Sequence, residues 1–266
     1  MKMPKVLVLR TAGTNCDKET AFAFECAKAK VDLVHINSLL IKKNPLDQYH
    51  ILALPGGFSY GDDIAAGKIL ANELKNKLQK DLKEFIKRGK PIIGICNGFQ
   101  ILVKAGFLPG NDNFKQEATL MINDSARFED RWVHLKHEAS NKQHAAKCIW
   151  TKDLPPVIYL PVAHGEGKFV VKDESVLLKL KRNDQIVLKY SDANGKQASY
   201  PYNPNGSVED IAGICDEAGL VFGLMPHPER HVQFTQHPHW TREKSGKVSD
   251  GLIIFKNAVS YARKVL

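Results

Sequence analysis

Long hydrophobic runs are missing from this chain of 266 residues. No apolar stretch comes near the roughly 18 residues that a membrane-spanning helix requires. The N-terminus has a basic start followed by VLVL, but this run is too short for the core of a signal peptide. We therefore expect a cytoplasmic protein with no membrane association, and we interpret VLVL as part of a first β-strand.

Cysteine is scarce, and its spacing excludes two classes of protein. No pair has the CxxC spacing of zinc clusters, and the pattern is not that of a disulfide framework. We expect reduced thiols, one of which is free to act as a nucleophile. The five cysteines are Cys16, Cys26, Cys96, Cys148 and Cys215.

Histidines are frequent near the C-terminus, but a metal-binding pattern is lacking. His227 and His231 have HxxxH spacing, yet Pro228 lies between them and disfavours the helix that this spacing needs. His237 and His239 follow in the same irregular tail. We therefore expect no metal site.

Charge is biased to one sign, since 38 basic residues face 29 acidic ones and the formal net charge is +9. An excess of positive charge favours binding to nucleic acid, to an acidic protein partner or to an anionic metabolite. The sequence has no RNP-like strand, helix-turn-helix signal or aromatic-lined repeat, so we expect no nucleic-acid binding. Lysines concentrate at 75–90, where the apolar residues have helical spacing, which is typical of a solvated helix face.

Strand-like and helix-like segments alternate in the first part of the chain. Apolar runs predict strands at 5–10, 31–36 and 51–55, and DKETAFAFECAKAK at 17–30 predicts a helix. This alternation implies parallel strand pairing. After GGFSYGDD we expect a helix through about residue 88, then a strand at PIIGI, and then a helix from about Gly98 to Ala105.

The second half is richer in turns. Short strand-like runs are separated by stretches such as SDANGK and YNPNGS, which suggests added strands and long loops on the same sheet. We predict a single α/β domain, residues 1–266, with an open, mostly parallel (mixed) sheet flanked by helices, and a C-terminal helix. The strand-like runs are 157–163, 168–171, 185–190, 211–215 and 220–225.

The segment PIIGICNGFQ places a cysteine where an apolar strand gives way to a helix. Gly94 and Gly98 flank Cys96 in the spacing of the G-x-S-x-G nucleophile elbow. The sharp turn needs small neighbours, and it leaves the cysteine at the carboxyl end of the sheet, where open α/β folds bind ligands. The following helix N-terminus favours the thiolate form. The alternative is a buried cysteine in a tight packing corner.

A nucleophilic thiol also needs a base, a group that orients the base, and donors for the oxyanion. His227 and Glu229 in MPHPER follow a strand-like run, and an extended chain around Pro228 would put both side chains on one face. The candidate oxyanion donors are backbone N–H groups of Asn97, the residue after the nucleophile, and of the turn Pro55-Gly56-Gly57, where another strand ends. Taken alone, His-Pro-Glu is compatible with an ordinary loop. The glycines Gly56 and Gly57 are likewise compatible with an ordinary turn.

Together these segments resemble the class I (triad) glutamine amidotransferases, which have a flavodoxin-like α/β architecture. GICNGFQ and MPHPER are typical of the whole class. GGFSYGD, AHGEG and NPNGS narrow the similarity to the glutaminase subunits of phosphoribosylformylglycinamidine synthase. Similar segments run through nearly the whole chain, at 11–17, 56–63, 94–102, 123–132, 161–169, 200–213 and 223–230.

The resemblance implies a role for each matching residue. Cys96 attacks the carboxamide of glutamine, His227 shuttles the proton, and Glu229 orients His227. The backbone N–H groups of Gly57 and Asn97 hold the oxyanion. Gln100 is implied to contact glutamine. His164, Gly165 and Glu166 are implied to line the site or the path by which ammonia leaves.

The implied reaction converts L-glutamine and water to glutamate and ammonia through a thioester. The ammonia passes to a synthetase partner, which uses ATP and magnesium to convert formylglycinamide ribonucleotide to formylglycinamidine ribonucleotide. No GxxxxGKS phosphate loop is present, so no cofactor is expected in this chain, and ATP and magnesium are expected on the partner. A third small subunit is left open.

Two other functions are compatible with parts of this pattern. A cysteine hydrolase or peptidase of related fold would share the elbow but would need no His-Pro-Glu. A class I amidotransferase could instead feed another acceptor, such as imidazole glycerol phosphate or a pyrimidine. Ammonia release from glutamine tests the first alternative, and the identity of the productive synthetase partner tests the second.

Overall fold

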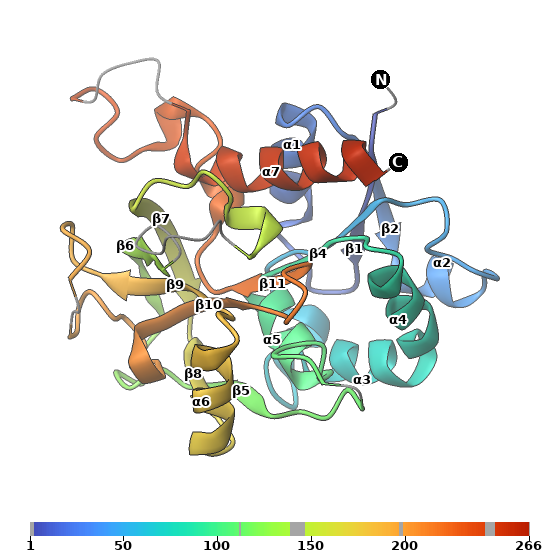
Figure 1. Cartoon of the computed structure of the whole chain (residues 1–266), viewed down its shortest axis with the longest axis horizontal. Coiled ribbons are helices and arrows are strands. Elements are labelled where there is room, and N and C mark those ends of the chain that lie inside the picture. The colour runs from blue at the N-terminus through green and yellow to red at the C-terminus, as the bar shows by residue number, and fades with distance from the viewer. Residues whose placement is uncertain (1–2, 112, 139–146, 197–198, 243–247, 266) are drawn as a thin grey trace.

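A mixed sheet of nine strands lies at the centre of the structure, a computed structural model that describes residues 3–111, 113–138, 147–196, 199–242 and 248–265 (Figure 1). The strand order is β2-β1-β3-β4-β11-β10-β9-β6-β7. A separate small sheet pairs β5 with β8. The strands are β1 (Lys5–Arg10), β2 (Lys30–His35), β3 (Ile51–Leu54), β4 (Ile92–Ile95), β5 (Ala118–Met121), β6 (Glu129–His137), β7 (Val157–His164), β8 (Lys168–Val171), β9 (Ile186–Ser191), β10 (Ile211–Cys215) and β11 (Val221–Leu224).

The half of the sheet from β2 to β11 is parallel. Strands β3, β4 and β11 are buried along their whole length, as expected for short apolar strands covered on both faces. Helices α1 and α7 cover one face, and α5 covers the other, with α3 and α4 beside it (Figure 1). These helices are α1 (Asp17–Cys26), α3 (Lys68–Lys77), α4 (Gln79–Lys87), α5 (Asn97–Lys104) and α7 (Asp250–Val265).

Parallel pairing brings the carboxyl ends of β1, β3, β4 and β11 to one edge of the sheet. The turns after these strands are the polar segments that the sequence singled out, at 11–16, 56–63, 96–97 and 225–230. Strand β7 reaches the same edge from the antiparallel half, which consists of β10, β9, β6 and β7. The fold therefore gathers the candidate residues before any side chain is considered.

The elements predicted for the first part of the chain are confirmed in kind, with differences at their ends. The helix expected over 17–30 stops at Cys26, because Lys28 has a φ of 66° and the chain enters β2 at Lys30. The single helix expected to run to about residue 88 is two helices, α3 and α4. They are interrupted at Leu78, whose φ of −121° is not helical.

The second half departs further from prediction. The run 168–171 was expected on the main sheet, but it is β8 and pairs with β5 in the small sheet. Helices α2 (Ile36–Leu40) and α6 (Glu174–Arg182) and strand β6 were not predicted. For α6 a signal was present in the sequence, since the Asp173 side chain accepts a hydrogen bond from the Val176 N–H and caps the helix.

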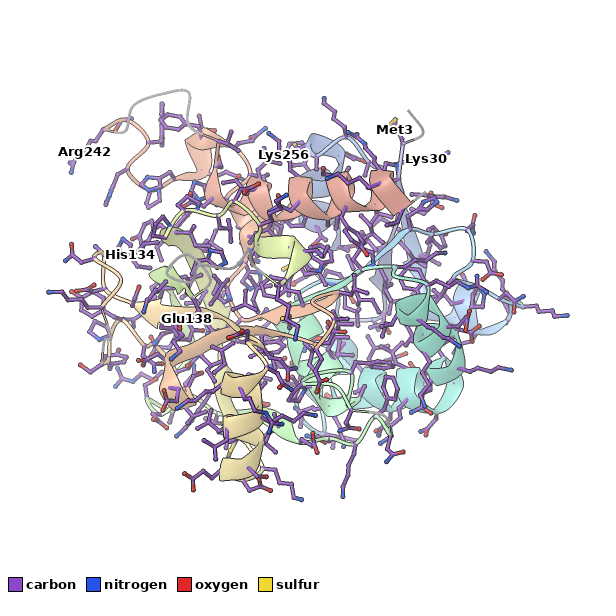
Figure 2. All side chains as sticks on the ribbon, viewed as in Figure 1. Met3, Lys30, His134, Glu138, Arg242 and Lys256 are labelled. Atoms are coloured by element: carbon purple, nitrogen blue, oxygen red, sulfur yellow. The ribbon has the colours of Figure 1, made fainter. Side chains whose placement is uncertain are left out.

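Basic side chains are spread around the surface rather than gathered on one element. Lys30, Arg242 and Lys256 lie at the periphery of the molecule, on different parts of the chain (Figure 2). Helix α4 buries Leu82 and Phe85 and leaves its lysines outside, as its apolar spacing predicts. Within the described residues, no helix combines the length and the apolar character that crossing a membrane demands.

Candidate active site

Cys96 stands at a sharp turn between β4 and α5. Its φ of 51° and ψ of −106° lie outside the ordinary regions for an L-residue, and its N–H donates to the Leu224 carbonyl on the neighbouring strand at 2.8 Å. A side chain at Gly94 would put its Cβ 2.5 Å from the Gly98 carbonyl oxygen. A Cβ at Gly98 would lie 1.9 Å from the carbonyl oxygen of Leu54. The glycines are therefore required by the close approach of three backbones.

His227 and Glu229 form a buried pair at the end of β11. His227 Nδ1 lies 2.6 Å from Glu229 Oε1, and the residues are 2% and 1% exposed. We predicted an extended chain here, but Pro228–Arg230 forms a turn of 3-10 helix (η5). The two side chains meet nonetheless, because the His227 N–H donates to the Pro161 carbonyl of β7 at 2.8 Å and fixes the entry to the turn.

The electrostatics of His227 are set by burial and by its neighbours. Burial alone lowers the pKa of an imidazole. The carboxylate of Glu229 and the thiols of Cys96 and Cys16 outweigh this effect and raise the pKa of His227 well above its usual value. An imidazole in this setting readily takes up a proton from a neighbouring thiol.

Gly56 is the point at which these side chains converge. A Cβ placed on it would lie 2.8 Å from His227 Cε1, 3.2 Å from Cys16 Sγ and 3.5 Å from Cys96 Cβ. The imidazole and both cysteine side chains thus surround one backbone position just after β3. Only a residue without a side chain leaves room for this arrangement.

Replacing Gly56 with alanine is expected to lower kcat for glutamine hydrolysis about 10–100-fold, because the added methyl pushes the imidazole away from Cys96. The colliding atoms belong to side chains, and the φ of Gly56 is not in the left-handed region, so we expect less than about 1.5 kcal/mol of destabilisation. Steady-state kinetics and thermal unfolding of the same preparation measure both effects. An unchanged kcat would show that the position of the imidazole does not limit the reaction.

Gly57 and Asn97, the two predicted oxyanion donors, follow the neighbouring strands β3 and β4 at the same edge of the sheet. Residues 13–16 and 56–58 pair through Phe58 N–H to Gly13 O at 2.9 Å and Cys16 N–H to Gly56 O at 3.2 Å. These bonds use the Phe58 N–H and the Gly56 carbonyl, and they leave the Gly57 N–H without a partner among the described residues. Asn97 begins α5, where the first N–H groups have no acceptor within the helix. Both predicted oxyanion donors are therefore available.

The Asn97 side chain forms hydrogen bonds that link α5 to the turn after β3. Its Nδ2 donates to Gln100 Oε1 at 3.0 Å and to Asp62 Oδ1 at 3.1 Å, and its Oδ1 accepts from the Ser59 N–H at 3.3 Å. These contacts attach the GGFSYGDD turn to the start of α5. The sequence showed GGFSYGDD only as a motif. The structure shows that Ser59 and Asp62 of this turn bond to the Asn97 side chain.

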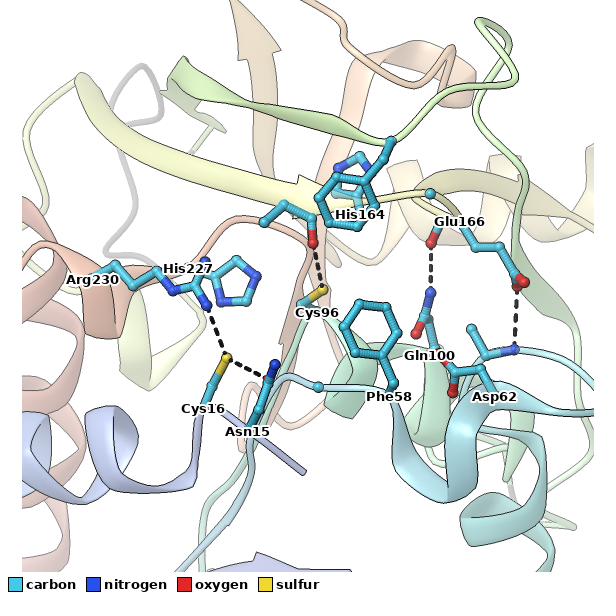
Figure 3. A pocket seen from close by; sticks show the side chains of 15 residues that line it. Asn15, Cys16, Phe58, Asp62, Cys96, Gln100, His164, Glu166, His227 and Arg230 are labelled. Carbon is cyan, nitrogen blue, oxygen red and sulfur yellow. Dashed lines mark hydrogen bonds between the residues drawn. The ribbon is translucent and has the colours of Figure 1, made fainter. Parts of the chain in front are cut away.

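A cavity of about 380 Å³ opens beside Cys96, within the size range of small-molecule sites. Cys96 lines it although its exposed fraction is only 6%, and its thiol donates to the Ala163 carbonyl at 3.7 Å (Figure 3). Gln100 Nε2 donates to the Glu166 carbonyl, so the side chain is held against the cavity wall. Glu166 Oε2 accepts from the Ala66 N–H at 3.4 Å. Gln100 and Glu166 thus both line the cavity.

His164 lines the cavity at the end of β7. Its Nδ1 is 3.1 Å from Asn123 Oδ1, and its Nε2 is 3.5 Å from Asn205 Nδ2. Burial, together with the nearby His227, lowers the pKa of His164 to about 3, so the ring is neutral. A neutral ring tied to two amides positions β7 and the adjoining Gly165, which lines the cavity, rather than carrying protons.

Cys16 was not singled out as a functional residue from the sequence. Cys16 lines the cavity, and its thiol accepts a hydrogen bond from Arg230 Nη2 at 3.2 Å (Figure 3). Phe58 and Phe128 also line the cavity without having been named. The available signal was topological, because Cys16 follows the first strand and parallel pairing brings that loop to the edge where His227 lies.

Comparisons with known proteins agree with this geometry. A family model described as a CobB/CobQ-like glutamine amidotransferase domain matches residues 3–262. The phosphoribosylformylglycinamidine synthase subunit PurQ of Dehalococcoides mccartyi is 50% identical over 266 residues, covering 100% of both chains. The corresponding subunit of Methanococcus maripaludis is 46% identical over 276 residues, covering 98% of each. The solved structure of PurLQS from Thermotoga maritima has a TM-score of 0.72 and 33% identity, covering 98% of this chain and 99% of that one.

Proposed function

The chain belongs to the PurQ family of glutamine amidotransferases, the glutaminase subunits of phosphoribosylformylglycinamidine synthase, and from this premise we propose how its own residues hydrolyse glutamine. Its α/β sheet with flanking helices is that of the class I amidotransferases, as predicted. The observation that carries the proposal is the convergence of Cys96, His227 and Glu229 at one edge of the sheet.

The first half of the reaction forms a thioester. The thiol proton of Cys96 passes to His227, and the sulfur attacks the carboxamide carbon of glutamine. The backbone N–H groups of Gly57 and Asn97 donate to the oxyanion that forms. His227 then gives its proton to the departing nitrogen, ammonia leaves, and the glutamyl group stays on Cys96. Glu229 accepts from Nδ1 throughout and stabilises the charged imidazolium.

The second half releases glutamate. A water molecule gives a proton to His227 and attacks the thioester carbon, and the same two N–H groups hold the new oxyanion. Collapse of this intermediate breaks the carbon–sulfur bond, and Cys96 recovers the proton. We assign Gln100 and Glu166 to orienting glutamine in the cavity, and His164 and Gly165 to shaping its wall.

We propose that the ammonia is used as a substrate by a second chain. We propose that a synthetase partner holds ATP and magnesium, since this chain has no phosphate loop and the amidotransferase family model matches residues 3–262. We propose that residues 1–266 form one amidotransferase domain. The name PurLQS of the solved relative supports such an assembly. We propose a third small subunit as a further component of this assembly. We propose the cytoplasm as its location.

Reconstitution tests the proposal. The chain is mixed with a formylglycinamide ribonucleotide synthetase subunit, with and without the small subunit, and glutamine-dependent formation of the amidine is measured. We expect product only when the chain, glutamine and ATP are all present. Product with a different synthetase and none with this one would show that the acceptor has been assigned wrongly.

The isolated chain should turn over glutamine slowly, because uncoupled hydrolysis wastes the substrate. We expect the synthetase complex to raise the rate by a factor typical of coupling between sites, roughly 5–150-fold. Ammonia release measured before and after addition of the partner gives this ratio. Full turnover by the chain alone would contradict the expectation.

Replacing Glu229 with alanine should leave about 10–100-fold more residual glutaminase activity than loss of the nucleophile, because an orienting carboxylate is partly dispensable. The same kinetics on Glu19→Gln give a matched control. Glu19 is an exposed carboxylate that pairs with Arg230 at 3.4 Å outside the triad, and its loss should change kcat less than about twofold. Equal defects in the two variants would argue that the Glu229 contact with His227 has no special role.

A further inference from the structure

Cys16 is a second thiol within reach of the proposed triad. It lies in the loop after β1, is 1% exposed, and donates from Sγ to Asn15 Oδ1 at 3.3 Å. Burial raises the pKa of its thiol, and the neighbouring His227 and Arg230 work in the opposite direction. The proposed glutaminase mechanism makes no use of this thiol, although it lies at the same convergence point as Cys96.

Three potential metal ligands meet at this point. Cys16 Sγ, one ring nitrogen of His227 and one carboxylate oxygen of Glu229 all lie within 4.8 Å of one another. All three residues are at most 2% exposed. Nε2 of His227 and Oε2 of Glu229 have no hydrogen-bond partner of normal geometry among the described residues. Buried polar atoms without partners are uncommon in folded proteins, and here they belong to two of the three ligands.

We infer that Cys16, His227 and Glu229 form a site for a thiophilic divalent cation, with Zn²⁺ as the best match, and that occupancy of this site inhibits the enzyme. Thiolate, imidazole and carboxylate are the ordinary ligands of zinc. Zinc–ligand bonds of about 2.0–2.3 Å in a tetrahedron separate the ligand atoms by about 3.3–3.8 Å. Side-chain movements of about 1 Å therefore suffice, and the fourth position is left for water from the cavity.

The charges of the site suit a divalent ion. The Cys16 thiolate and the Glu229 carboxylate together neutralise Zn²⁺. The Arg230 guanidinium, 3.2 Å from Cys16 Sγ, opposes a cation but favours the thiolate that binds it. Arg230 also pairs with Glu19 at 3.4 Å on the outer side, which offers the guanidinium a position farther from the ion. Metal binding releases two protons to solvent, one from the Cys16 thiol and one from the nitrogen of the His227 imidazolium that coordinates the ion.

The inhibitory consequence depends on the proposed function, whereas the binding site itself does not. A His227 ring that coordinates zinc cannot take the proton of Cys96. A Glu229 carboxylate that coordinates zinc no longer orients the ring. The ion would therefore block the thiol attack while leaving the fold intact.

Cobalt spectroscopy on the full chain tests the site. The protein is freed of metal with a chelator and titrated with Co²⁺, which gives a thiolate charge-transfer band when sulfur is a ligand, and the ion is then displaced with Zn²⁺. Cys16→Ser, Cys96→Ala and, as a distant control, Cys26→Ser are compared, with thermal unfolding of each metal-free variant as a check of folding. Zinc inhibition of ammonia release is measured in parallel on the parent chain.

We expect one Co²⁺ per chain with the thiolate band in the parent, Cys96→Ala and Cys26→Ser. The band should disappear in Cys16→Ser, with zinc affinity reduced at least about tenfold. Retention of the band in Cys16→Ser, or its loss in Cys96→Ala, would overturn the site. Zinc bound with unchanged ammonia release would overturn the inhibition. The spectra report the site even if glutamine proved not to be the substrate, so failure of the two proposals can be told apart.

Discussion

Cys96→Ala is expected to lower glutamine hydrolysis by a factor on the order of 10⁴ or more, because no other group can form the thioester. The fold should survive, since alanine tolerates the same backbone conformation about as well as cysteine and removes only one atom beyond Cβ. Ammonia release from glutamine measures the first effect, and thermal unfolding measures the second.

The matched control for this variant is Cys26→Ala, which removes a thiol at the end of α1, away from the cavity. Its glutaminase rate should stay within about twofold of the parent, as expected for a substitution outside the site. Substantial hydrolysis by a folded Cys96→Ala protein would show that the nucleophile lies elsewhere. Cys16 would then be the first residue to examine.

Gly98→Ala should be the most destabilising single methyl addition at the elbow. The added Cβ would lie 1.9 Å from the Leu54 carbonyl oxygen and 2.7 Å from the carbonyl carbon. These are backbone atoms of the buried strand β3 and cannot turn aside as a side chain can. We expect about 3 kcal/mol of lost stability, which corresponds to a fall in Tm of roughly 6–12 °C for a chain of this size. Glutaminase activity should fall with it, since α5 carries the Asn97 N–H.

The control for this prediction is Gly165→Ala. A Cβ at Gly165 would find its nearest neighbour, a ring carbon of Phe128, at 3.9 Å, which is ordinary van der Waals contact. Its Tm should stay within about 2 °C of the parent, as for surface substitutions of less than about 0.5 kcal/mol. If the two variants unfolded at the same temperature, the close approach of α5 to β3 would not be needed for stability.

The parallel half of the fold and the residues of the elbow could be predicted because their signals are local. Strand β4 and helix α5 meet within PIIGICNGFQ, and the glycine spacing is itself the steric requirement of the turn. The approach of His227 to Glu229 was also expected from their separation of two residues. The turn of 3-10 helix that actually joins them was not, because the choice between extended and turned backbone depends on the bond from His227 N–H to Pro161 O.

The rest depended on contacts between distant parts of the chain. Cys16 reaches His227 only because β1 and β11 end at the same edge of one sheet, and nothing in TNCD alone indicates this. Similarly, Asn123 and Asn205 were seen as members of motifs, but their common function as partners of His164 required the folded structure. Strand β8 could not be assigned to the small sheet from its own residues, since the run KFVV suits either sheet.

The most direct test of the account is covalent labelling with a glutamine analogue that carries an electrophilic diazoketone in place of the carboxamide. The labelled chain is digested, and the modified residue is identified by tandem mass spectrometry, with excess glutamine as a competitor. We predict one label per chain, on Cys96, with protection by glutamine and none on the Cys96→Ala variant. A label on Cys16 or another cysteine, in a preparation that hydrolyses glutamine, would contradict the assignment of Cys96 as the nucleophile.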